Sequence, residues 1–296
     1  MQARPFLTFV CFKWRGPDPQ RSYTHVHVNA LYRMLAANYR KPFRFVCITD
    51  DASGLVEQVE TLPLPEMQDI PAPQGKLYPS CYRRLWLFSA EAAKVLPGKV
   101  VCLDIDLVIC GDVTEFFNRT EQCVFWSDAD SNWLKYSGGL FMITTGTRCK
   151  VWDTFDPDKS PQITKDAELV GSDQAWISYV LDGEATWNRS HGIYRTRNLT
   201  PASKPLILQT PSVHKPWTRS FSTRYKKYAQ IWQQYAAEPE ALKPMLEKGK
   251  YRILKRCTSG QRGDIVELTA DEAEHMRRMG LIGSHRIESK RPEVLK

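Results

Sequence analysis

The stretch Lys99-Val-Val-Cys-Leu-Asp104-Ile-Asp106-Leu-Val-Ile-Cys-Gly111-Asp112 places two carboxylates inside an apolar run. Asp104 and Asp106 interrupt this run at alternate positions, and the run then resumes and turns at Gly111. An ionised carboxylate in an apolar setting is costly unless it is paired or binds a metal. The stretch therefore predicts a buried strand that ends at two carboxylates, which need a cation and favour a metal-bound phosphate. A solvated pair of aspartates in a loop is the alternative.

The residues before this stretch alternate between strand and helix patterns. Residues 6–12 and 43–49 are β-branched and aromatic, as strands are, and apolar residues recur at helical spacing over 24–38 between them. A second helical stripe runs from Tyr82 to Ala92. Further strands are expected at 123–126 and 139–144, and further helices at 173–181 and 225–237. Because strand–helix–strand units build parallel sheets, the sequence predicts an α/β fold with a mixed, mainly parallel sheet flanked by helices.

The last fifty or so residues differ in character from the rest of the chain. Lys248-Gly249-Lys250 opens a tail in which 263–269 has the pattern of a strand and 270–279 that of a helix, with Thr269 as its N-cap. We therefore predict two domains. Residues 1–247 form the large α/β domain, and residues 248–296 form a small C-terminal strand–helix module.

The positive charge is concentrated at the C-terminal end. The formal net charge is +8, yet residues 1–214 hold 23 Lys/Arg and 23 Asp/Glu, whereas residues 215–296 hold 18 and 10. A basic segment of this kind favours a polyanionic neighbour such as nucleic acid, a phosphorylated glycan or a membrane surface. A solvated basic face without a partner is the alternative.

Other features bear on location and redox state. No apolar run approaches the ~20 residues that span a bilayer, and the first residues lack the apolar core of a signal peptide. We expect a soluble, cytoplasmic protein. None of the 8 cysteines forms a Cys-x-x-Cys pair, so the sequence favours reduced, structural thiols over a zinc site or a disulfide framework.

Four further motifs accompany the two aspartates along the chain. They are Arg84-Leu85-Trp86, Tyr136-Ser137-Gly138-Gly139, Ser172-Asp173-Gln174 and Lys215-Pro216-Trp217. In order and approximate spacing, the set resembles nucleotide-sugar glycosyltransferases with the GT-A (Rossmann-like) fold. It is most similar to glycosyltransferase family 8, the group of glycogenin and the bacterial lipopolysaccharide galactosyltransferases. That family has Lys-Leu, Asn-Ser-Gly, Gly-Asp-Gln and Lys-Pro-Trp at the corresponding places.

The resemblance implies a donor and metal site. Asp104 would contact the donor ribose and the metal, Mn²⁺ or Mg²⁺, and Asp106 would bind the metal directly. Arg84 would lie near the diphosphate, where a cation is needed, and Lys215 would clamp it. A surface arginine is the alternative for Arg84.

The third metal ligand departs from the family pattern. The family has a histidine six residues before the lysine of Lys-Pro-Trp, where this chain has Gln209, while His214 directly precedes Lys215. We predict His214 as the third ligand. A ligand from Gln209 or water, with His214 only packing, is the alternative.

The resemblance also assigns residues to the nucleotide base, the donor sugar and the acceptor. Phe12-Lys13-Trp14 would hold the nucleotide base, with Trp14 either stacking on it or lying at the core edge. Ser137-Gly138-Gly139 would let the backbone approach the sugar, unless it is a plain turn. Asp173 and Gln174 would face the donor sugar and the acceptor. Asp173 would orient the acceptor hydroxyl or stabilise developing positive charge, unless it is merely an acid at a helix N-terminus.

The sequence thus predicts a metal-dependent hexosyltransferase that moves a sugar from a nucleotide-diphosphate donor, a UDP-sugar, to a hydroxyl acceptor. The resemblance implies retention of anomeric configuration. A surface glycan is the favoured acceptor. Two features favour instead a phage-encoded enzyme that acts on modified DNA bases. They are the basic last quarter and the pattern of residues 263–269, which resembles a pattern in small bacteriophage proteins.

Other classes of function are weaker alternatives. A nucleotidyltransferase would need a better phosphate loop than residues 13–17 offer. A non-catalytic binding or virion-associated protein on a transferase fold is the alternative of another class.

Overall fold

The structure is a computed structural model that describes residues 6–15, 23–67, 70, 80–127, 134–169, 171–210, 215–236, 249–252 and 265–268. Its contacts divide the chain into two compact units, Met1–Thr210 and Pro211–Lys296. The boundary expected near residue 247 stays a prediction. No helix in the described ranges is both long enough and apolar enough to cross a membrane.

A seven-stranded sheet forms the centre of the first unit, in the order β3-β2-β1-β4-β7-β6-β8. The strands β3, β2, β1 and β4 run parallel to one another, and β7 lies antiparallel between β4 and β6. The bounds are β1 (Leu7–Lys13), β2 (Phe43–Thr49), β3 (Glu60–Leu62), β4 (Lys99–Leu103), β6 (Cys123–Trp126), β7 (Ser137–Thr144) and β8 (Ala185–Trp187). This topology confirms the predicted α/β fold with a mixed, mainly parallel sheet.

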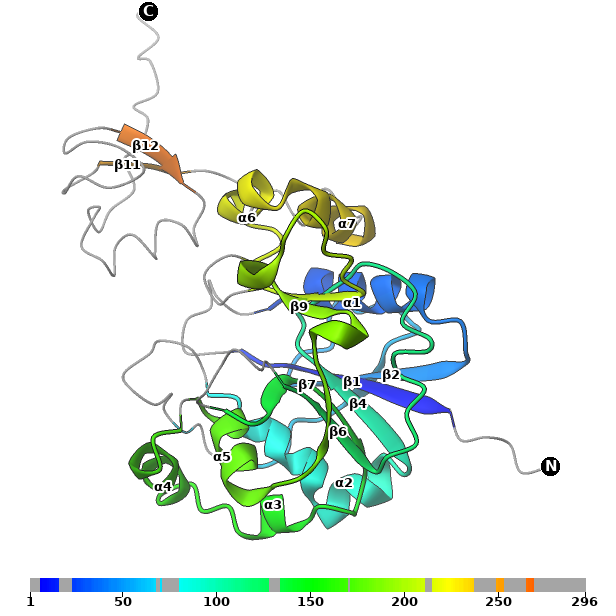
Figure 1. Ribbon diagram of the computed structural model, residues 1–296, viewed down its shortest axis with the longest axis vertical. Helices are drawn as coiled ribbons and strands as arrows, with labels where there is room; N and C mark the ends of the chain where they lie inside the picture. The colour runs from blue at the N-terminus through cyan, green and yellow to red at the C-terminus, as the bar shows by residue number, and fades with distance from the viewer. Residues whose placement is uncertain are drawn as a thin grey trace, which may run out of the picture. The chain divides into compact units, whose positions relative to one another are not determined.

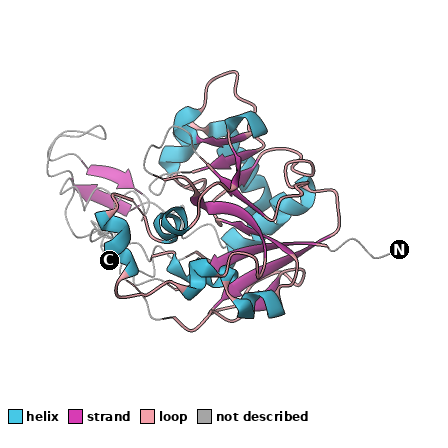
Figure 2. Ribbon diagram, turned by 60° about the horizontal axis from the view of Figure 1, so that its bottom comes forward, coloured by secondary structure: helices cyan, strands magenta, loops and turns pink. Residues whose placement is uncertain are grey.

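Helices cover both faces of this sheet (Figures 1 and 2). The helix α1 (His25–Asn38) lies on one side of the central strands, whereas α2, α3 and α5 lie on the other (Figure 1). The central strands are apolar and buried on both faces, as parallel strands between helices usually are. The bounds on the second side are η3 (Tyr82–Phe88, a 3₁₀ helix), α2 (Ala90–Val95), α3 (Lys150–Asp153), α4 (Ser160–Asp166) and α5 (Asp173–Val180).

The single helix expected from Tyr82 to Ala92 is wrong, because the chain forms two short helices there. Ser89 has an extended backbone and ends the 3₁₀ helix η3. Its hydroxyl then accepts a hydrogen bond of 3.0 Å from the amide of Ala92 and so caps α2. The apolar spacing could not reveal this break. The consequence for the site is that Arg84 lies in a tight, buried 3₁₀ segment.

A second, three-stranded sheet supports the end of the Asp-bearing stretch. Its order is β5-β10-β9, with β10 antiparallel to β5 and parallel to β9. The bounds are β5 (Val108–Ile109), β9 (Ile193–Arg195) and β10 (Ile207–Gln209), with the 3₁₀ turns η4 (Arg189–His191) and η5 (Thr196–Asn198) beside β9 in sequence. This small sheet brings the end of the first unit next to the turn after β4.

In the second unit, the described residues form two helices and a pair of strands. The helix expected at 225–237 is α7 (Lys226–Ala236), which follows α6 (Arg219–Arg224). The strand expected at 263–269 is β12 (Ile265–Leu268), and it pairs antiparallel with β11 (Gly249–Arg252). The helix expected at 270–279 lies outside the described residues.

Candidate functional site

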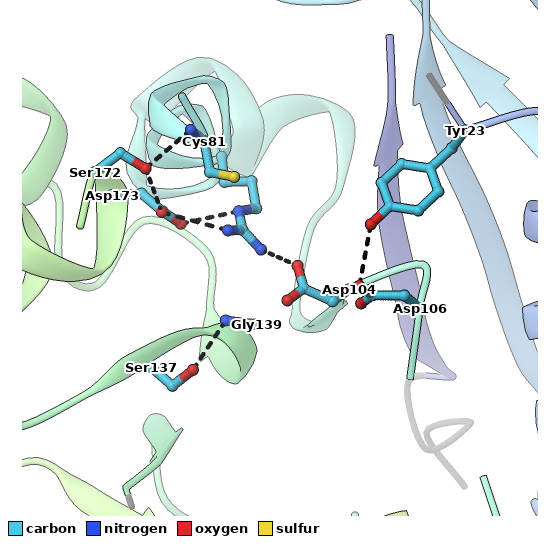
Figure 3. A network of polar contacts seen from close by, with 9 residues as sticks. Tyr23, Cys81, Asp104, Asp106, Ser137, Gly139, Ser172 and Asp173 are labelled. Carbon is cyan, nitrogen blue, oxygen red and sulfur yellow. Dashed lines mark hydrogen bonds and ion pairs between the residues drawn. The ribbon is translucent and has the colours of Figure 1, made fainter. Parts of the chain in front are cut away.

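The two aspartates lie in a tight turn where β4 ends. The amide of Leu107 donates to the carbonyl oxygen of Asp104 over 3.3 Å, which closes a four-residue turn. Ile105, between the two acids, is buried in the core. Figure 3 shows the side chains of Asp104 and Asp106 next to one another. The turn thus brings together two carboxylates that a regular strand would hold apart along its length.

Arg84 joins Asp104 to a third carboxylate, that of Asp173. Its Nε lies 2.9 Å from Asp173 Oδ2, its Nη2 donates to Asp173 Oδ1 over 3.3 Å, and its Nη1 donates to Asp104 Oδ1. The side chains of Arg84 and Asp173 are only 9% and 2% exposed. Burial disfavours the charged guanidinium, but the nearby charges, that of Asp173 foremost, raise the pKa of Arg84 well above its ordinary value. Arg84 therefore carries a permanent, buried positive charge.

A short chain of hydrogen bonds fixes Asp173 at the start of α5. The hydroxyl of Ser172 donates to Asp173 Oδ1 over 3.2 Å and accepts from the amide of Cys81 over 2.9 Å (Figure 3). Burial raises the pKa of the Cys81 thiol to about 12. This thiol is therefore neutral at physiological pH. The chain of bonds ties the beginning of α5 to the beginning of η3, from which Arg84 projects.

Two glycines of β7 leave the space that the carboxylates occupy. A Cβ built on Gly138 would collide with Asp173 Oδ2, and one built on Gly139 would collide with Asp104 Oδ2. The Gly139 carbonyl accepts from the amide of Asp104 over 2.8 Å, and its amide donates to the Ser137 hydroxyl over 3.2 Å. These residues form a strand rather than the plain turn that was the alternative. The missing side chains make room for Asp104 and Asp173.

The structure brings some of the predicted site residues together around Arg84. The residues in contact around Arg84 are Asp104, Asp173, Ser137, Gly138 and Gly139, with Asp106 in the adjoining turn. Phe12 and Trp14 pack with the hydrophobic core, Trp14 being partly exposed, and Lys13 is buried at the end of β1. Gln174 lies against Gly171. Lys215 belongs to the second unit, and His214 lies outside the described residues.

Two residues outside the predicted motifs contact Asp106. The phenol of Tyr23 donates to Asp106 Oδ2 over 3.1 Å (Figure 3). The hydroxyl of Thr210 donates to the Asp106 carbonyl oxygen over 3.1 Å. Asp106 is 4% exposed. Neither partner lies in a motif, and both are distant from Asp106 in sequence. No sequence signal marks them.

The site brings several carboxylate oxygens close together. Arg84 contacts Asp104 and Asp173, and Tyr23 donates a hydrogen bond to Asp106 in the adjoining turn. The described part of the chain holds no group of three or more His, Cys, Asp or Glu that could bind a metal. The pair of Asp104 and Asp106 nevertheless supplies hard oxygen donors, which suit Mg²⁺ or Mn²⁺. These donors fit a divalent cation.

Solved structures with this architecture are known. No protein-family profile and no curated protein sequence matches the chain. The galactosyltransferase LgtC, solved in complex with donor and acceptor sugar analogs, matches with a TM-score of 0.51 and 14% identity over 79% of this chain and 98% of LgtC. The protein has the GT-A fold. A glycosyltransferase of Streptococcus pneumoniae, GlyE, matches with a TM-score of 0.51 and 14% identity over 82% of this chain, which spans 64% of GlyE.

The GT-A fold of this chain has a defined edge at which a ligand is expected. In open α/β sheets, ligands bind beyond the carboxyl ends of the parallel strands. Lys13 ends β1 and the turn with Asp104 and Asp106 follows β4, and these two strands are parallel neighbours. The cluster around Arg84 therefore lies at the edge where the fold accommodates ligands.

Proposed function

We propose that this protein is a metal-dependent glycosyltransferase that moves a sugar from a nucleotide-diphosphate donor to a hydroxyl acceptor. In this reaction the bond between the anomeric carbon and the diphosphate oxygen breaks, and a bond to the acceptor oxygen forms. The nucleoside diphosphate leaves, and the hydroxyl proton is released to solvent. A UDP-sugar donor, transfer of a hexose and retention of configuration belong to the proposal.

The observation that carries the proposal is the paired carboxylates of Asp104 and Asp106 beside the buried guanidinium of Arg84. The carboxylates of Asp104 and Asp106 supply hard oxygen donors for a divalent cation, and the cation and Arg84 together suit a diphosphate. A bound Mg²⁺ or Mn²⁺ would neutralise the diphosphate leaving group as a Lewis acid. In open α/β sheets, ligands bind beyond the carboxyl ends of the parallel strands, where these residues lie, and this supports the same assignment.

The burial of Asp173 supports a role in positioning. Its carboxylate is occupied by the guanidinium of Arg84 and the hydroxyl of Ser172, so we assign it to holding Arg84 toward the diphosphate. Gln174, which is partly exposed, is then the predicted residue that faces the donor sugar and the acceptor. Lys215 as a diphosphate clamp and Phe12-Lys13-Trp14 as the base site stay predictions.

A screen of nucleotide sugars tests the proposed function. In the absence of acceptor, we expect slow release of nucleoside diphosphate from one donor in the presence of Mn²⁺ or Mg²⁺, and none after chelation with EDTA. The nearly isosteric variant Asp106→Asn should lose this release, whereas Asp182→Asn, whose carboxylate is exposed and pairs with Lys135, should keep it. Failure of every donor to bind or react, or an unaffected Asp106→Asn, would contradict the proposal.

For the acceptor, we propose a surface glycan. The excess of 18 Lys/Arg over 10 Asp/Glu in residues 215–296 supports modified DNA bases as the second candidate. Binding of the full-length protein to duplex DNA separates the two, because phosphate contacts make DNA affinity fall steeply with salt. A flat response to salt would exclude DNA as the acceptor.

The hydrogen bond from Tyr23 leads to a smaller effect at the same turn. Loss of a group that orients a metal ligand typically costs about 10- to 100-fold in metal affinity. We expect Tyr23→Phe, which removes only the hydroxyl that donates to Asp106 Oδ2, to weaken Mn²⁺ binding about tenfold and to leave the fold intact. Titration of Mn²⁺ by electron paramagnetic resonance measures this. Tyr179→Phe, an exposed tyrosine of α5, is the matched control.

A further inference from the structure

Gln209, the last residue of β10, lies beside the carboxylate of Asp104. A Cβ built on Gly139 would be 3.1 Å from Asp104 Cγ and 3.2 Å from Gln209 Nε2, so the carboxylate and the carboxamide converge over the same backbone position. Both side chains are partly exposed. The two polar ends therefore share one side of Gly139, where a ligand from solvent can reach them.

The residues on either side of Gln209 are fixed to the stretch that carries Asp106. Leu208 pairs with Val108 in the antiparallel ladder of β10 and β5. Thr210 is 5% exposed, and its hydroxyl donates to the carbonyl oxygen of Asp106 over 3.1 Å. Because both neighbours are bound in this way, the backbone of Gln209 is held at the turn. Its position beside Asp104 is a consequence of the small sheet rather than of a flexible loop.

We propose that Gln209 supplies the third protein oxygen of the cation site, completing a set of ligands with Asp104 and Asp106. This inference rests on the metal dependence in the proposed function. A half-turn of the carboxamide exchanges Nε2 with Oε1 and presents the carbonyl oxygen to a cation. A glutamine ligand is compatible with the finding that the described residues hold no group of three or more His, Cys, Asp or Glu that could bind a metal. The third ligand is thus a neutral oxygen from the first unit.

An oxygen-only set of ligands has a consequence for metal selectivity. Carboxylate and carbonyl oxygens suit Mg²⁺ and Mn²⁺, whereas imidazole nitrogen suits Zn²⁺ and Ni²⁺. A site built from Asp104, Asp106 and Gln209 therefore discriminates against the second pair more strongly than a site with a histidine in the third position. The substitution Gln209→His should reverse part of that preference.

Direct cation binding to the full-length protein, without donor or acceptor, tests this assignment. Free Mn²⁺ is measured by electron paramagnetic resonance, and Mg²⁺ and Ni²⁺ are measured by competition. We expect Gln209→Ala to weaken Mn²⁺ binding about tenfold. We expect Gln209→His to raise the affinity for Ni²⁺ relative to Mg²⁺ at least tenfold. Gln58→His, at an exposed glutamine in the loop after β2, should behave as the wild type.

The outcomes separate this assignment from the proposed function. Unchanged Mn²⁺ affinity in Gln209→Ala together with a loss in His214→Ala overturns the assignment and gives the third ligand to His214. The expected responses in a protein that transfers no sugar from any donor support the assignment and overturn the proposed function. A wild-type protein that binds no divalent cation overturns both.

Discussion

Replacement of Arg84 by methionine is expected to lower the free energy of unfolding by about 3–5 kcal/mol, the range for breaking a buried ion pair by removing one partner. Asp173, which is 1% exposed in the wild-type structure, would lose the guanidinium that contacts both of its oxygens. Asp104, whose side chain is 29% exposed, can turn to water and loses less. Urea denaturation followed by circular dichroism measures the change.

Two further variants identify the cause of this loss. Arg44→Met removes an arginine that also contacts both oxygens of a carboxylate, Glu60, but at the surface, and it should cost no more than about 1 kcal/mol. The double variant Arg84→Met with Asp173→Leu removes both buried charges and should recover most of the lost stability, but no activity. Equal losses for Arg84→Met and Arg44→Met would show that the buried pair does not carry the effect.

The second large effect is expected from a single methyl group at Gly139. The added Cβ would collide with Asp104 Oδ2 and lie 3.1 Å from its Cγ. The strand β7 cannot retreat, because it pairs with β4 on one side and β6 on the other. Asp104 must therefore turn away, and its contact with Arg84 is lost. Because a misplacement of about 1 Å can cost about 100-fold in rate, we expect Gly139→Ala to lower turnover of the donor at least 100-fold.

The matched control for Gly139→Ala is Gly111→Ala. A Cβ on Gly111 would meet only the end of the flexible Leu206 side chain, at 3.3 Å. This variant should therefore keep near wild-type turnover. For Gly139→Ala, the melting temperature should fall only modestly, since overpacking of this kind costs about 1–3 kcal/mol. Full turnover in Gly139→Ala would refute the close packing of Asp104 against β7.

The strands were predictable because their apolar runs are long and compact. The expected strand at 43–49 coincides with β2, and the run before Asp104 coincides with β4. The helix over 82–92 was wrong because apolar spacing does not register a serine cap. The stripe of apolar residues continues across Ser89 while the backbone changes direction there. Hydrophobic pattern therefore located the core and left one helix boundary undetected.

The candidate site was predictable only in part, for a different reason. Asp104 and Asp106 are conspicuous in sequence because charge in an apolar run is costly. The partners of the carboxylates in the site are not conspicuous in sequence, because they are distant along the chain. Arg84 lies 20 residues from Asp104 and 89 residues from Asp173. The contact of Gln209 with the Gly139 region depends on the pairing of β5 with β10. These strands have only two and three residues, so their pairing cannot be predicted from the sequence pattern. Long-range packing, rather than local pattern, determines these neighbours.

The buried pair of Arg84 and Asp173 constrains how this chain can diverge. A lineage that loses the guanidinium at position 84 keeps a buried, uncompensated carboxylate unless position 173 changes as well. Neither single step is tolerated easily, so the two positions should change together or remain fixed among descendants. Exposed pairs such as Arg44 and Glu60 carry no such restriction, because water solvates either charge alone. Covariation at 84 and 173 would thus record the history of the site independently of its chemistry.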